Sequence, residues 1–160
     1  MTIKPGDMIP NVTLKTMVNG TPQDITTEQI FANKKVVIFG VPGAYTPTCS
    51  SKHLPGFVAK AQEFAGKGVD TIACISVNDH FVMDAWGQAQ KVGDKILMLA
   101  DGTGAFAKAT GTEFDFSGAG LGLRNKRYAM LVENKKVTAL DLEESGGLTV
   151  SSADAFICKL

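Results

Sequence analysis

The chain has 160 residues, the usual size of one folding unit, and its 44% hydrophobic content is enough for a sizeable core, so we expect a single domain over residues 1–160. Its 16 basic and 16 acidic residues balance to a formal net charge of zero, which argues against a nucleic-acid partner or attraction to an acidic membrane surface. Composition therefore favours small neutral substrates.

The N-terminus and the cysteines indicate the cellular compartment. The stretch MTIKPGDMIP lacks the long apolar centre of a secretory signal, and the runs VVIFGV and ILMLA are far too short to span a bilayer. Cys49, Cys74 and Cys158 are an odd, widely spaced set that does not resemble a disulfide framework and suits a reducing compartment. We expect a cytoplasmic protein, not a membrane protein, with at least one free thiol.

The predicted elements alternate between strands and helices. A hairpin turn is expected first, at Val18-Asn19-Gly20-Thr21. Nearly continuous apolar runs then predict strands buried on both faces, with helical patterns between them. In chain order these are strand 36–41, helix 53–64, strand 69–77, helix 79–92, strand 96–100, helix 103–109, strands 128–132 and 137–140, and helix 152–160.

This order predicts an α/β fold. The middle of the chain reads as β-α-β, whereas the first hairpin and the pair Asn134-Lys135, which separates the last two strands, indicate antiparallel neighbours. The central sheet should therefore be mixed and flanked by helices, with an N-terminal hairpin extension. A reactive cysteine at the start of the first long helix fits a thioredoxin-like architecture by analogy.

The segment VVIFGVPGAYTPTCSSKHLPGF, residues 36–57, is the most informative part of the chain. Thr46 followed by Pro47 is a strong helix-start signal, which places Cys49 at the third helical position. Backbone N–H groups in a first turn have no partner inside the helix, and together with the helix dipole they stabilise an anion there. The anion expected here is the Cys49 thiolate. Pro55 lacks a backbone donor and should kink this helix, which favours a first turn that can unwind.

Ionisation alone does not make an efficient nucleophile, because a thiolate loses intrinsic nucleophilicity as it becomes less basic. A site that uses a thiolate as nucleophile must also stabilise the charge that develops on the leaving group. Candidate donors are the first-turn amides, the Thr46 hydroxyl and an arginine from elsewhere in the chain.

The motif PGAYTPTC at positions 42–49 resembles the Pro-x-x-x-Thr-x-x-Cys signature of the peroxiredoxins. Further segments resemble the type II peroxiredoxins in order along nearly the whole chain: KHLPGF, ACISVNDHFVMDAW, LADGTGAFAKATG, GLGLRNKRYAMLVE and GLTVSSAD. The resemblance implies a thioredoxin-like fold, a homodimer and an antioxidant thiol peroxidase that reduces hydrogen peroxide and small alkyl hydroperoxides through a sulfenic acid.

The resemblance also implies roles for individual residues. Cys49 would be the peroxidatic cysteine, Thr46 would hydrogen-bond the peroxide, Pro42 would shield the thiolate and Arg127 would fix both thiolate and substrate. Arg124 is the rival for the arginine role, but Arg127 directly precedes the strand YAMLVE, as the family's arginine does. On the residues alone, Arg127 could equally be a strand-end charge paired with Glu133 or solvent.

The recycling step has several candidates. Cys74 reads as a buried core cysteine, although plant members of the group carry a second cysteine at this spacing, which makes it a possible resolving cysteine. Val150 stands where some animal members have theirs, and Cys158 has no recognised counterpart. We expect an external thiol to reduce the Cys49 sulfenic acid, through glutathione or glutaredoxin, with thioredoxin as the second choice.

Other functions stay open on the sequence alone. A thioredoxin-like protein could use Cys49 as a thiol-based redox sensor or binding module with little turnover. His53 lies four residues after Cys49, so a cysteine hydrolase is conceivable, but no group to orient His53 is evident and a packing or hydrogen-bonding role is expected. Two histidines and three scattered cysteines give no zinc spacing and no phosphate loop occurs, so neither metal nor organic cofactor is expected.

Overall fold

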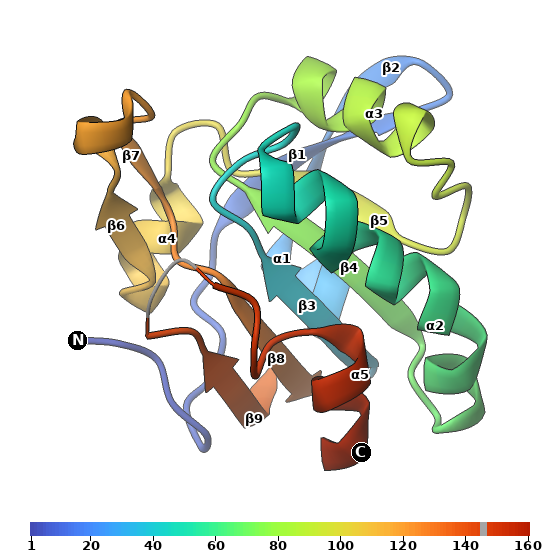
Figure 1. The fold of residues 1–160 in the computed structure, drawn as a ribbon. Coiled ribbons are helices and arrows are strands. Elements are labelled where there is room, and N and C mark those ends of the chain that lie inside the picture. Colours follow the sequence, from blue (N-terminus) through green and yellow to red (C-terminus); the bar gives the residue numbers. More distant parts are fainter. Residues whose placement is uncertain (145–146) are drawn as a thin grey trace.

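A computed structural model describes residues 1–144 and 147–160 of the chain and confirms the α/β thioredoxin-like architecture (Figure 1). Its main sheet has the strand order β2-β1-β5-β4-β3-β8-β9 and is mixed, because β3, β4 and β5 run parallel while the outer strands pair antiparallel. The strands of this sheet are β1 (Thr13–Val18), β2 (Thr21–Thr26), β3 (Lys35–Gly40), β4 (Thr71–Ser76), β5 (Leu97–Ala100), β8 (Tyr128–Glu133) and β9 (Lys136–Leu142).

Helices cover both faces of the sheet. One face is covered by η1 (Cys49–His53), α2 (Leu54–Gly66), α3 (His80–Ala89) and α5 (Ala153–Phe156), and the other by α1 (Thr27–Phe31) and α4 (Ala105–Thr110). A separate two-stranded sheet pairs β6 (Glu113–Asp115) with β7 (Leu123–Asn125), and two short 3-10 helices, η2 (Ser117–Ala119) and η3 (Ile157–Lys159), complete the described elements. No helix in these described ranges is long and apolar enough to cross a bilayer.

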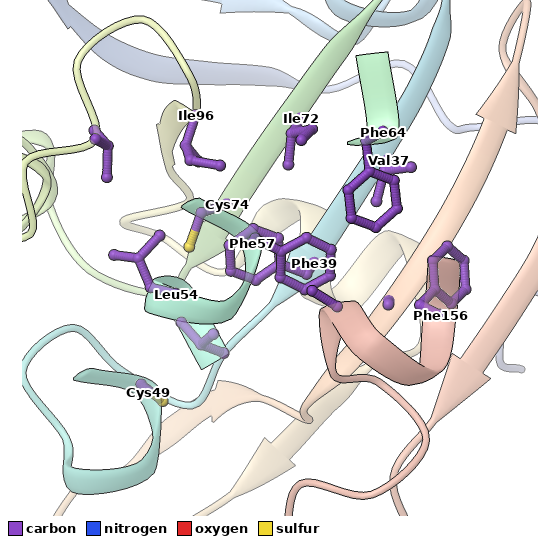
Figure 2. Packing of buried hydrophobic residues seen from close by; sticks show 14 of the residues in the cluster. Val37, Phe39, Cys49, Leu54, Phe57, Phe64, Ile72, Cys74, Ile96 and Phe156 are labelled. Atoms are coloured by element: carbon purple, nitrogen blue, oxygen red, sulfur yellow. The ribbon is translucent and has the colours of Figure 1, made fainter. Parts of the chain in front are cut away.

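Strand β3 supplies side chains to a hydrophobic core on each face of the sheet. Val37 and Phe39 point towards α2, whereas Val36 and Ile38 belong to the core under α1 and α4. On the α2 side the ring of Phe39 stacks on that of Phe57, with centroids 4.1 Å apart (Figure 2). The continuous apolar run in the sequence thus reflects a strand covered on both sides, as predicted.

Gly40 ends β3 where a side chain would not fit. It pairs with Tyr128 of β8, and a Cβ atom at position 40 would lie 2.3 Å from the Tyr128 ring. The fully buried ring therefore occupies the space that a side chain at position 40 would need. The loop that leads to Cys49 begins directly after Gly40.

The predicted strands and hairpin turn are confirmed, with boundaries shifted by one or two residues. Asn19 and Gly20 form the first turn with φ of 52° and 78°, and the Asn134-Lys135 pair connects β8 to β9 with φ of 48° and 70°. The last predicted helix, over 152–160, is not continuous, since it divides into α5 and η3. The sequence did not predict α1 or the β6-β7 pair, which are short and carry little hydrophobic periodicity.

Candidate active site

The loop after β3 turns the chain into the helix that carries Cys49. Tyr45 adopts a left-handed backbone, with φ of 65°, and the helical backbone begins at Pro47. The Ser50 N–H donates to the Thr46 carbonyl at 2.9 Å, which is the first helical hydrogen bond and makes Thr46 the N-cap by backbone geometry. Cys49 is therefore the third helical residue, as predicted.

The turn that holds Cys49 is π-helical. The Leu54 N–H donates to the Cys49 carbonyl five residues back, so the hydrogen bond in η1 spans one residue more than in an α-helix. In this pattern the donor to the Ser50 carbonyl would be residue 55, which is proline and has no N–H. The disturbance expected from Pro55 thus takes the form of a π turn around the cysteine.

Two side chains, one in α3 and one directly after it, hold this turn in place. The Gln90 Nε2 donates to the orphaned Ser50 carbonyl at 3.1 Å, and the Trp86 Nε1 donates to the Ser50 hydroxyl at 3.0 Å. Trp86 is fully buried and is the only tryptophan in the sequence. Neither residue could be recognised from the sequence, because nothing in an amphipathic helix marks which polar group will bond a residue 36 to 40 positions away.

The guanidinium of Arg127 lies beside the Cys49 sulfur. Its Nη2 donates to Cys49 Sγ at 3.2 Å, Cys49 is fully buried and Arg127 is 5% exposed. Within the described residues no carboxylate lies at ion-pair distance from Arg127, and Glu133 is exposed at the far end of β8. A buried cation without a carboxylate needs another anion close by, and the thiolate form of Cys49 provides one.

His53 lies on the other side of the same guanidinium. Its Nε2 is 2.9 Å from the Ser151 carbonyl, which can only accept, so Nε2 carries the proton and Nδ1 accepts from Arg127 Nη1 at 3.0 Å. Burial, together with the charge of Arg127, lowers the pKa of His53 from 6.5 to about 3. The imidazole is therefore neutral at physiological pH and hydrogen-bonds the arginine, which is the hydrogen-bonding role expected of it.

Thr46 and Pro42 lie in the loop between β3 and η1. The Thr46 hydroxyl donates its proton to the Gly43 carbonyl at 2.7 Å, so in this structure it is not the donor expected from the sequence, and its lone pairs are left to accept a hydrogen bond. Arg124 Nη1 donates to the Pro42 carbonyl at 3.2 Å, while its Nε donates to the Leu121 carbonyl at 3.0 Å. Arg124 therefore supports the loop from outside, and the arginine that contacts the sulfur is Arg127.

Of the two other cysteines, Cys74 lies close enough to Cys49 and Arg127 for their charges to affect its pKa, whereas Cys158 lies in η3. Cys74 is fully buried in the middle of β4 and belongs to the same hydrophobic core as Cys49 and Leu54 (Figure 2). Burial raises the pKa of the Cys74 thiol, with a smaller contribution from Cys49. Cys158 is exposed in η3 near the C-terminus. Neither forms a disulfide in this structure.

Comparison with known proteins gives one consistent family. The family model described as Redoxin matches residues 4–157. Peroxiredoxin-2D of Arabidopsis thaliana is 46% identical over 93% of this chain and 93% of its own, and the chloroplastic Peroxiredoxin-2E of the same plant is 47% identical over 95% of this chain and 67% of its own. The crystal structure of reduced Prx3 in complex with hydrogen peroxide from Vibrio vulnificus superposes with a TM-score of 0.94, at 47% identity over 99% of both chains.

Proposed function

Because this chain belongs to the redoxin family and, within it, to the type II peroxiredoxins, which are thiol-dependent peroxidases, we propose that Cys49 is the sulfur that attacks the peroxide. The observation that carries this proposal is the hydrogen bond from Arg127 Nη2 to Cys49 Sγ in a buried site. A positive charge held there stabilises the thiolate, which is the nucleophilic form of cysteine.

The reaction begins when the Cys49 thiolate attacks one oxygen of the peroxide. An S–O bond forms as the O–O bond breaks, and the leaving oxygen takes up a proton and departs as water from hydrogen peroxide or as an alcohol from an alkyl hydroperoxide. Cys49 is oxidised to the sulfenic acid and the peroxide is reduced. One thiol then displaces water from the sulfenic acid to form a mixed disulfide, and a second thiol releases the Cys49 thiol and a disulfide product.

Arg127 is the proposed donor to the substrate as well as to the sulfur. Its Nε–H is buried and has no acceptor among the described residues, so it remains available to a bound oxygen. A donor already in place where negative charge develops needs no reorganisation during the reaction, and such donors contribute much of the rate enhancement in comparable sites.

Thr46 and Pro42 complete the proposed substrate site. Since the Thr46 hydroxyl donates to Gly43, it can accept the O–H of the peroxide and thereby orient it. Pro42 is buried in the same loop and would keep water from the thiolate. Cys49, Thr46, Arg127 and Pro42 thus all take part in the proposed first step.

The substrates and reductant belong to the same proposal. Hydrogen peroxide and small alkyl hydroperoxides are the proposed substrates, supported by the likeness to the peroxide complex of Vibrio vulnificus Prx3. An external thiol is the proposed reductant, because the buried Cys74 is poorly placed to resolve the sulfenic acid from within its strand. Glutathione or glutaredoxin is the first candidate and thioredoxin the second. We place this antioxidant activity in the cytoplasm.

A homodimer is the proposed assembly. Large apolar side chains are exposed on the elements that border the Cys49 loop: Tyr45 in the loop, Phe81 on α3, Phe114 on β6 and Leu123 on β7. Large exposed apolar side chains that gather into a patch commonly mark a contact surface. Sedimentation equilibrium measures the assembly directly: a dimer mass supports the proposal and a monomer mass at micromolar concentration rejects it.

Trapping the intermediate tests the proposed function. Reduced protein mixed with one equivalent of hydrogen peroxide in the presence of dimedone should carry the adduct on Cys49, and Cys49→Ser should abolish glutathione-dependent turnover. An adduct confined to another cysteine, or turnover that survives Cys49→Ser, would reject the assignment. Adduct formation without catalytic turnover with any of the three reductants would favour the redox-sensor function.

A further inference from the structure

We propose that Glu143 is a positioning residue of this site and acts on Arg127 through Ser151 and His53. The inference rests on the proposed function, since it concerns the arginine assigned to the thiolate. Glu143 follows β9 and reaches none of the reacting groups itself. Its effect would be to set the direction from which Arg127 approaches the sulfur.

The Glu143 side chain hydrogen-bonds Thr149 and Ser151. Its carboxylate accepts four hydrogen bonds: from the Thr149 N–H at 2.8 Å, the Thr149 hydroxyl at 2.6 Å, the Ser151 N–H at 2.8 Å and the Ser151 hydroxyl at 2.7 Å. Glu143 is 7% exposed and Ser151 is fully buried. Burial alone would raise the pKa of Glu143, but the bonds from Thr149 and Ser151 lower it to about 2. The carboxylate is therefore ionised and holds both residues.

Ser151 passes this constraint on to His53. The Ser151 carbonyl accepts the Nε2 proton of His53 at 2.9 Å, and this bond decides which ring nitrogen keeps its lone pair. Nδ1 can accept from Arg127 Nη1 at 3.0 Å only in that tautomer. Fixing the Ser151 backbone thus fixes the orientation of the imidazole, and the imidazole in turn fixes the position of Arg127 Nη1.

Glu143 also holds the backbone of Arg127. The Glu143 N–H donates to the Arg127 carbonyl at 3.0 Å, so the residue touches both the main chain of the arginine and the start of the side-chain network. The path from Glu143 to Ser151, His53, Arg127 and Cys49 contains a hydrogen bond at each step and is buried at each step. The same contacts would also serve a purely structural role, namely closing the loop after β9, so the test must separate the two.

A double-mutant cycle separates them. The variants are Glu143→Gln, His53→Leu and the pair, and the readouts are the rate of Cys49 oxidation by hydrogen peroxide and the rate of Cys49 alkylation by iodoacetamide, followed by mass spectrometry of the Cys49 peptide. We expect Glu143→Gln to slow both reactions roughly tenfold when His53 is present and to have no further effect when His53 is leucine, because the path is then already broken. Equal effects in both backgrounds would overturn the proposal.

Rescue by a conservative variant adds a second criterion. In His53→Gln the side-chain oxygen can accept from Arg127 while the amide nitrogen donates to Ser151. Glu143→Gln should therefore still slow the Cys49 reactions in the His53→Gln background. In the His53→Leu background it should not. The matched control is Asp101→Asn, which alters another buried carboxylate that accepts two backbone N–H bonds, at Phe106 and Ala107, outside this path. It should lower the melting temperature without slowing alkylation. A rate loss in Asp101→Asn equal to that in Glu143→Gln would contradict the proposal.

Two further measurements keep the outcomes distinct. If Glu143→Gln does not fold, Ser151→Ala replaces it, because this substitution removes one of the four bonds and leaves the carbonyl in place. It should slow alkylation roughly twofold when His53 is present and leave the rate unchanged when residue 53 is leucine. An equal effect of Ser151→Ala in both backgrounds would overturn the proposal. If the unaltered protein is alkylated at Cys49 but is not oxidised by peroxide, the proposed function fails, while the cycle measured by alkylation still decides the role of Glu143.

Discussion

Arg127 and Cys49 are 78 residues apart in the sequence, yet Nη2 of the arginine donates to the cysteine sulfur at 3.2 Å in the interior of the protein. The fold creates this contact by placing β8 beside β3. Ala129 and Leu131 of β8 face α2, and Arg127 precedes them with the same two-residue period, so its side chain lies on the face that carries Cys49.

Arg127→Lys should slow the reaction of reduced protein with hydrogen peroxide by roughly 100-fold to 1,000-fold, the usual cost of losing a donor to a developing oxyanion. Lysine keeps the charge but cannot donate to Cys49, His53 and a substrate oxygen from one planar group. Stopped-flow fluorescence of Trp86, which hydrogen-bonds the residue next to Cys49, provides the measurement. Arg124→Lys is the matched control and should lose less than Arg127→Lys; the reverse order would mean that Arg124 is the functional arginine.

His53 should make the protein less stable as the pH falls from 6.5 to 3. An unfolded chain protonates this histidine near pH 6.5. In the folded protein, burial and the charge of Arg127 outweigh the opposing effects of the Ser151 carbonyl and Glu143 and lower the pKa of His53 to about 3. The unfolded state therefore binds the extra proton in this window, and the free energy of unfolding falls by up to about 1.4 kcal/mol per pH unit. Urea unfolding at a series of pH values should show that the free energy of unfolding of His53→Gln lacks this decrease. If the free energy of unfolding changes equally with pH in the two proteins, His53 is not its source.

Cys74→Ser should leave glutathione-dependent turnover nearly unchanged. The Cys74 thiol is fully buried in β4 and burial raises its pKa, so it is a poor nucleophile as long as the strand is intact. After one equivalent of peroxide and excess glutathione, non-reducing mass spectrometry should find Cys49 joined to glutathione, and Cys158→Ser should behave in the same way. A stoichiometric disulfide between Cys49 and Cys74 would instead require recycling with two cysteines.

Gly40→Ala should destabilise the fold by about 1 to 3 kcal/mol, the usual cost of overpacking a core, because the added Cβ would lie 2.3 Å from the Tyr128 ring. Gly66→Ala is the control, since a Cβ atom there meets nothing within 4 Å. Thermal unfolding of the two variants should therefore differ clearly. Equal melting temperatures would show that Tyr128 moves aside without cost.

Much of the fold could be predicted from the sequence because the signals are local. The apolar run that became β3 is buried on both faces, and the positive φ values of Asn19 and Gly20 suit a two-residue hairpin turn. The Thr46-Pro47 pair likewise marks the helix start through the preferences of two adjacent residues. Such features depend on neighbouring residues, which any reader of the sequence can see.

The surroundings of Cys49 depend on contacts between distant segments, and those could not be predicted. Nothing near Glu143 in the sequence indicates that its carboxylate will accept four bonds from Thr149 and Ser151 or that Ser151 will orient His53. The hydrogen bond from Trp86 to Ser50 likewise joins residues that lie far apart in the sequence. The choice of Arg127 over Arg124 came from resemblance, although the two-residue period running back from Leu131 through Ala129 could have suggested it.

The central claim is that the Cys49 sulfur, held beside Arg127, reduces peroxide directly. The measurement that tests it most directly is the rate of Trp86 fluorescence change when reduced protein meets hydrogen peroxide under single-turnover conditions, compared with Cys49→Ser. The account predicts a fast change whose rate rises linearly with peroxide concentration and is absent in Cys49→Ser. A change of equal rate in the serine variant, or no faster oxidation than that of free cysteine in the unaltered protein, would contradict it.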